Sequence, residues 1–82
     1  MELKMNISLT RVMLECLIAY YLNGYLVAKK VMIHYADRVS IKNRKTLKMI
    51  VERLNVSDEE KQKEYFYNLS KTLSPSDNPN HL

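Results

Sequence analysis

The stretch SLTRVMLECLIAYYLNG, residues 8–24, decides the fold. Apolar side chains recur in it three and four residues apart, which is the pattern of one helix face: Leu9, Val12, Met13, Cys16, Leu17 and Tyr20. A second apolar set covers most of the remaining circumference: Leu14, Ile18, Tyr21 and Leu22. Only Arg11 and Glu15 interrupt it with charge. A helix that is apolar nearly all round must be buried on more than one side.

Two or three further helices are expected after this one. Asn23 and Gly24 favour its end, with the glycine in a left-handed cap; the alternative is one long helix that contains Gly24 at a cost of about 1 kcal/mol. Residues 25–35 predict a second helix that buries Val27, Ala28, Val31 and Tyr35 and turns Lys30, His34, Asp37 and Arg38 outward. The β-branched residues of this segment leave a strand as the alternative.

The second half of the chain carries clearer helix signals. Ser40 caps a third helix to Leu54, whose buried stripe is Leu47, Ile50, Val51 and Leu54. Ser57 and Glu60 form a capping box for a fourth helix. That helix buries Tyr65, Phe66, Leu69 and Leu73 and ends at Ser74-Pro75. The polar tail that follows, residues 74–82, is expected to be disordered.

The chain is therefore expected to be an all-α bundle of three to four helices, with one domain over residues 1–73. At 82 residues its core is small, and small cores rarely supply more than about 3–5 kcal/mol of stability. We expect a homodimer to bury the second face of the first helix. The expected interface consists of Leu14, Ile18, Tyr21, Leu22 and Tyr25.

Basic residues are concentrated in the first 53 positions, which hold ten cationic and four acidic side chains, a net charge of +6. The candidate contact residues for an anionic partner are Arg38, Lys42, Arg44, Lys45, Lys48 and Arg53. Of these, Lys42, Lys45, Lys48 and Arg53 are expected opposite the buried stripe. Three interpretations remain open for this face: solvated surface, contact with duplex DNA, and docking on an acidic protein. The DNA-contact interpretation has one variant, an imperfect helix-turn-helix with Thr46 and Leu47 in its recognition helix.

Catalytic and metal-binding residues are not expected. The single cysteine, Cys16, lies on the apolar stripe and should be a buried, protonated thiol. His34 and His81 have no usual zinc spacing with it. The sequence also carries no glycine-rich phosphate loop. We expect no enzyme, no cofactor and no small-molecule substrate.

A cytoplasmic location is expected, because one cysteine cannot form an internal disulfide and no signal-peptide pattern is present. The apolar segment 12–28 is shorter than the about 20 residues of a membrane span, and Glu15 and Asn23 interrupt it. A membrane span is therefore not expected.

Residues 43–73 carry a family resemblance in Arg44-Lys45-Thr46-Leu47, Ile50-Val51-Glu52-Arg53-Leu54 and Glu59-Glu60-Lys61-Gln62-Lys63-Glu64-Tyr65. This order resembles the small enterobacterial biofilm and acid-stress regulators of the YmgB/AriR kind. The resemblance implies a helical dimer that modulates transcription by engaging a response regulator and touching DNA as well.

A competing resemblance rests on Gly24-Tyr25-Leu26 together with Ala28, Ala36 and Arg53. These residues are similar to the AraC negative regulators, which are small helical proteins that bind and silence activators. The tryptophan of that family is absent here. Both resemblances imply a small bacterial regulator that binds a transcription factor, and an inhibitor carried by a phage or plasmid is a further alternative.

Overall fold

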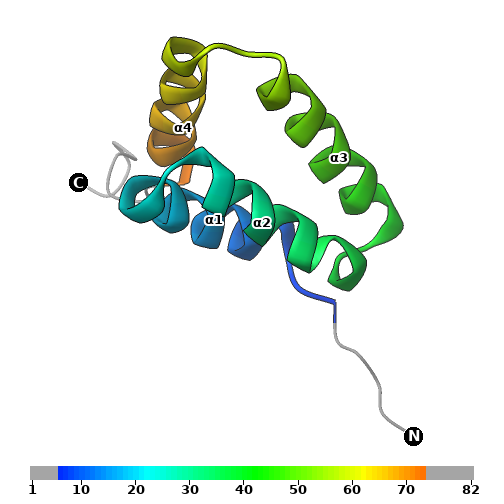
Figure 1. The fold of residues 1–82 in the computed structure, drawn as a ribbon. Helices are drawn as coiled ribbons and strands as arrows, with labels where there is room; N and C mark the ends of the chain where they lie inside the picture. The colour runs from blue at the N-terminus through cyan, green and yellow to red at the C-terminus, as the bar shows by residue number, and fades with distance from the viewer. Residues whose placement is uncertain (1–5, 74–82) are drawn as a thin grey trace, which may run out of the picture.

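The computed structural model describes residues 6–73 and contains four α-helices in that range (Figure 1). They are α1 (Leu9–Asn23), α2 (Tyr25–Tyr35), α3 (Ile41–Asn55) and α4 (Glu59–Leu73), with a short 3₁₀ turn, η1 (Ala36–Arg38), between α2 and α3. The described residues include no strand, so the all-α prediction is confirmed and segment 25–35 is a helix. The tail predicted to be disordered, residues 74–82, lies outside the described residues.

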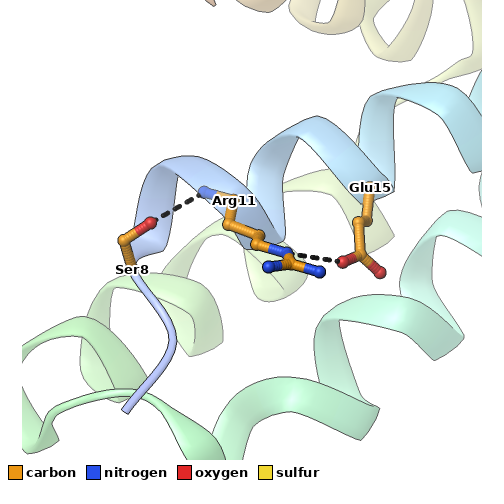
Figure 2. Close-up of polar contacts among 3 residues, drawn as sticks. All are labelled: Ser8, Arg11 and Glu15. Atoms are coloured by element: carbon orange, nitrogen blue, oxygen red, sulfur yellow. Dashed lines mark hydrogen bonds and ion pairs between the residues drawn. The ribbon is translucent and has the colours of Figure 1, made fainter. Parts of the chain in front are cut away.

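Two local interactions fix the start of α1 (Figure 2). The hydroxyl of Ser8 accepts a hydrogen bond of 3.1 Å from the backbone N–H of Arg11, which satisfies one of the free donors in the first turn. One turn further on, the Arg11 Nε lies 3.3 Å from the Glu15 carboxylate. The backbone N–H of Ile7 also donates to the Arg38 carbonyl at 2.8 Å, which holds the entry to α1 against η1.

Gly24 alone separates α1 from α2. Its φ of 92° and ψ of −178° place it in a backbone region that is essentially restricted to glycine. The predicted break is confirmed, but the extended ψ differs from the left-handed helical cap that we expected. The Gly24 N–H donates to the Tyr20 carbonyl at 2.8 Å and its carbonyl accepts from Ala28 at 3.2 Å, so one residue ends one helix and begins the next.

The helices are arranged as a close pair with two further helices above it. Helices α1 and α2 pack along each other, α4 packs on α1, and α3 rises from the far end of α2 (Figure 1). Nine apolar side chains form the buried core of residues 6–73: Val12, Met13, Cys16, Ala28, Met32, Val39, Leu47, Leu54 and Phe66. Every helix contributes to this core, so the four helices form a single packing unit.

The apolar stripes predicted from the sequence largely coincide with this core. Val12, Met13 and Cys16 are buried, and the other members of the first stripe pack against them half-buried. In α4, Phe66 is fully buried, while Tyr65, Leu69 and Leu73 are half-buried around it. Met32 and Val39 are buried although the sequence pattern did not identify them, because neighbouring elements cover them.

The cap of α4 is the main local correction. Asp58, not Ser57, occupies the cap, since its Oδ1 accepts from the Lys61 N–H at 2.9 Å. The Ser57 hydroxyl instead donates to the Arg53 carbonyl at 2.8 Å and closes the end of α3. The Gln62 amide donates to the carbonyls of Leu54 and Ser57 and ties the two helix ends together. The predicted cap of α3 is confirmed, with Ser40 accepting from Asn43 at 3.2 Å.

Candidate functional site

The six candidate basic residues lie on or next to α3. Lys42, Arg44, Lys45, Lys48 and Arg53 belong to the helix and are exposed, whereas Arg38 lies in η1 and is half-buried. Within residues 6–73 the one ion pair joins Arg11 to Glu15, so none of these six cations is neutralised by a carboxylate of the described residues. Their charge is available to an anionic partner.

These cations do not share one face of α3. At about 100° per residue, Lys42 and Lys45 lie opposite the buried Leu47. Lys48 lies instead beside the groove between α2 and α3, together with Arg44, and Arg53 lines a recess on the side of α4. The cations of α3 therefore spread over about half of the helix circumference. The best-defined part of this set is the pair Arg44 and Lys48, because that pair borders a concave apolar surface.

This concave surface, the α2–α3 groove, has a volume of about 350 Å³. Its lining comes from Met32 and Ile33 of α2, from Ala36 at the start of η1, and from five residues of α3: Arg44, Leu47, Lys48, Val51 and Glu52. Met32 and Leu47 are buried, whereas Ile33 retains 57% of its surface. The groove thus has an apolar base and a charged border on the α3 side only.

Hydrogen bonds hold the groove open at both ends. At one end the Arg44 Nε donates to the Ala36 carbonyl at 3.0 Å. At the other, the Tyr25 hydroxyl lies 2.6 Å from Asn55 Oδ1 and 3.5 Å from the Val51 carbonyl. Burial raises the pKa of Tyr25 above its ordinary value, so the phenol remains protonated and able to donate this bond into the alkaline range. One bond thus joins α3 to η1 at the end of α2, and the other joins α3 to the start of α2.

A second apolar surface lies on α1 and faces away from the core. Four of the five predicted interface residues form it, with exposed fractions of 41% for Leu14, 57% for Ile18, 58% for Tyr21 and 74% for Leu22. They follow one another at spacings of four, three and one residues and share one helix face. Tyr25, the fifth, is half-buried against α3 and does not belong to this surface.

The groups that could carry chemistry have other roles. Cys16 is fully buried, and desolvation together with the nearby Glu15 charge raises the pKa of its thiol to about 12. His34 is exposed on α2, with its ring against Tyr35 at 4.9 Å. Among residues 6–73, no three His, Cys, Asp or Glu side chains gather in a way that could hold a metal ion. No helix in that range is long and apolar enough to cross a bilayer.

Sequence reasoning missed the groove itself. Ile33 and Leu26 lie seven residues apart on α2 and remain exposed, which is an apolar repeat on the face opposite to the core. That repeat was the available signal. The repeat alone does not predict which of its two residues contacts α3. The groove contains Ile33 and not Leu26, because the path of α3 past α2 depends on the η1 turn.

Comparisons with known proteins add no assignment. No protein-family model, curated protein or solved structure matches the chain.

Proposed function

We propose that this chain is a small, non-enzymatic regulatory protein that modulates transcription by binding a protein partner, a response regulator or an activator, through the basic surface of α3. The observation that carries the proposal is the position of Arg44 and Lys48 beside an apolar groove, where neither cation pairs with a carboxylate of residues 6–73. A protein surface that is both acidic and apolar satisfies the two features together. This is also the activity that the two sequence resemblances imply.

Direct binding of duplex DNA is the second candidate, and the exposed cations of α3 favour it. Two details speak for a protein partner instead. Leu47, in the centre of the imagined recognition helix, is 1% exposed, and the Thr46 hydroxyl donates to the Lys42 carbonyl within the helix. The phosphate backbone also offers nothing that would fill the groove beside Ile33.

We further propose that the protein acts in the cytoplasm as a homodimer through the α1 surface formed by Leu14, Ile18, Tyr21 and Leu22. These side chains expose a contiguous apolar face, and apolar faces of this kind mark protein interfaces. A twofold axis beside α1 would bring the same face of a second copy onto it. This association would leave the basic surface of α3 accessible for the regulatory partner.

Photocrosslinking in the source cells tests the proposed function. A photoreactive residue in place of Lys45 should crosslink a transcription factor, and one in place of the exposed Lys63 of α4 should not. The same transcription factor, purified, should then bind the native chain and lose affinity when Arg44 and Lys48 are replaced by Ala. Equal crosslinking from both positions, or partners without a role in transcription, would contradict the proposal.

Fluorescence anisotropy with a labelled mixed-sequence duplex tests the DNA alternative. If α3 neutralises about four phosphates, the logarithm of the affinity falls against the logarithm of salt concentration with a slope near about −3.6. Replacement of Lys42, Lys45 and Lys48 by Ala should then abolish binding. Absence of binding at low salt would leave protein docking as the function of the basic surface.

A further inference from the structure

We infer that the α2–α3 groove binds one amphipathic helix of the partner, with acidic residues of that helix placed against Arg44 and Lys48. The inference rests on the proposed function and makes it specific by naming the occupant, its secondary structure and its direction. It follows from the shape of the groove, the order of charges along its border and the contacts that close its ends.

The shape of the groove suits a helix. Met32, Ile33, Leu47 and Val51 supply an apolar base between two helices, and a third helix can insert aliphatic side chains into it. Arg44 and Glu52 at the ends of this border lie eight positions apart on α3, a rise of about 12 Å at 1.5 Å per residue. Two turns of a partner helix cover this length and present apolar residues at positions i, i+3 or i+4, and i+7.

The charges along the border give the direction. Arg44, Lys48 and Glu52 are four residues apart and form one row on the α3 side of the groove. The row reads positive, positive, negative from the Ala36 end to the Tyr25 end. A helix with acidic residues at one end meets two cations in one orientation and meets Glu52 in the other. Charge complementarity therefore favours an acidic end beside Arg44.

The groove is prepared for its occupant before binding. The Arg44–Ala36 bond and the Tyr25–Asn55 bond connect α3 to the two ends of α2 in the free chain, so we expect docking to require little further ordering of these helices. The Arg44 bond uses Nε and leaves both terminal NH₂ groups without a partner among residues 6–73. A guanidinium held in this way is suited to pair with a carboxylate in a fixed geometry.

Binding of a synthetic peptide to the full chain tests the inference. The probe is a labelled helical peptide of about four turns, with a leucine stripe at i, i+4 and i+7 and glutamates in one half. A matched control peptide has the same composition, with the glutamates moved to the other face of the helix. Anisotropy should show the first peptide binding at least about tenfold more tightly than the second.

Variants of the chain locate the site. Ile33→Glu should abolish peptide binding, and because Ile33 is exposed the variant keeps the helical circular dichroism of the parent. Lys48→Glu should weaken binding by about tenfold or more and Glu52→Lys should strengthen it, since each reverses a border charge. Lys42→Glu and Lys45→Glu alter charge to the same extent outside the groove, and each should change the affinity by less than about threefold.

Several results would overturn the inference. If Lys45→Glu and Lys48→Glu weakened peptide binding equally, the peptide would be held by general electrostatic attraction and not by the groove. If the native protein is a dimer and Ile33→Glu dissociates it, the groove is occupied by a second copy of the chain and not by a partner helix. If the peptide does not bind while the Lys45 crosslink to a transcription factor persists, the groove assignment fails and the proposed function stands. If the peptide binds at the groove and no regulatory partner is crosslinked, the proposed function fails alone.

Discussion

The rings of Tyr20 and Phe66 stack face to face, with centroids 4.0 Å apart and planes 9° from parallel. This contact joins the last turn of α1 to the middle of α4. The Tyr65 ring meets Phe66 edge-on at 5.1 Å and the Tyr21 ring meets Tyr20 edge-on at 5.3 Å, so the stack lies within a chain of four aromatic rings. Phe66 is fully buried and is the residue of α4 that belongs to the buried core.

Removal of this ring should unfold most of the protein. Phe66→Ala is expected to reduce the free energy of unfolding by about 3–5 kcal/mol, because it leaves a cavity beside Tyr20 and removes the stack. A core of this size supplies about the same amount in total. Urea denaturation followed by circular dichroism measures the loss. The neighbouring Tyr67 is 56% exposed, and Tyr67→Ala should remain within about 0.5 kcal/mol of the parent as the control.

A substitution at Gly24 should destabilise the hairpin of α1 and α2 through the backbone alone. A Cβ at this position would meet no atom within 4 Å, so steric clash with neighbours does not contribute. The φ of 92° with an extended ψ is nevertheless unfavourable for every other residue, and Gly24→Ala should lose about 1–3 kcal/mol.

Asparagine tests the backbone argument at the same position. Asn tolerates the left-handed helical region but not this extended one, so Gly24→Asn should lose as much stability as Gly24→Ala. The two midpoints of urea denaturation are compared directly. An Asn variant clearly more stable than the Ala variant would mean that the turn relaxes into a left-handed helical cap.

The features predictable from the sequence are those that depend on near neighbours. Gly24 and Ser40 each act within four residues along the chain: Gly24 ends the first helix as expected, although not in a left-handed helical cap, and Ser40 caps α3 as expected. The Ser57 prediction failed because Asp58 offers an equally good cap one position later. The Ser57 hydroxyl is instead bonded to the Arg53 carbonyl at the end of α3.

The candidate site was only partly predictable for the same reason. That Lys42 and Lys45 point away from the core follows from the helical period of α3 alone. That Arg44 bonds to Ala36 and Tyr25 to Asn55 depends on contacts between residues 8 and 30 positions apart. Periodicity carries no information on such contacts, and Tyr25 was therefore predicted in the α1 interface when it faces α3.

Asp58 and Ser57 are adjacent at the start of α4, and the loss of stability on replacing each one shows which residue is the cap. Asp58→Ala should lower the free energy of unfolding by about 1 kcal/mol, because the Lys61 N–H loses its acceptor and a negative charge leaves the positive end of the helix dipole. Ser57→Ala removes an exposed hydrogen bond to the Arg53 carbonyl and should lose less. Chemical denaturation of both variants under the same conditions decides between them, and a larger loss for Ser57→Ala would restore the original prediction.

The Cys16 thiol should be unreactive in the folded protein, and its ionisation should make the free energy of unfolding depend on pH in the alkaline range. Its pKa is raised from the ordinary 9.0 to about 12, so the folded state holds the thiol proton more tightly than the unfolded chain does. The stability that follows is complete below pH 9 and is lost as the pH rises toward 12. The stability difference between the parent and Cys16→Ala should be constant at neutral pH and shift against the parent in that alkaline range.

Reaction with iodoacetamide provides an independent reading for the same residue. At neutral pH the native protein should be alkylated only as fast as it opens, and urea should accelerate the reaction sharply. Rapid alkylation under native conditions would show that the thiol is accessible and would contradict the burial of Cys16 in the core.

The α1 surface leads to a prediction about oligomeric state. Native protein should sediment as a dimer, and Ile18→Glu should sediment as a folded monomer, because a charge cannot be buried unpaired between two apolar faces. Since Ile18 is 57% exposed within one chain, its replacement leaves the core intact and helical circular dichroism should be retained. Met49→Glu, on α3 and 67% exposed, adds the same charge elsewhere and should leave the dimer unchanged.

Thermal unfolding distinguishes this dimer from nonspecific association. Dimerisation that is coupled to folding raises the unfolding temperature with protein concentration, so the native midpoint should rise on concentration and the midpoint of Ile18→Glu should not. The Met49→Glu control should follow the native behaviour. A native midpoint independent of concentration, together with a monomeric sedimentation profile, would remove the homodimer from the proposal. Leu14, Ile18, Tyr21 and Leu22 would then require a different partner, since their exposure would no longer be relieved by a second copy.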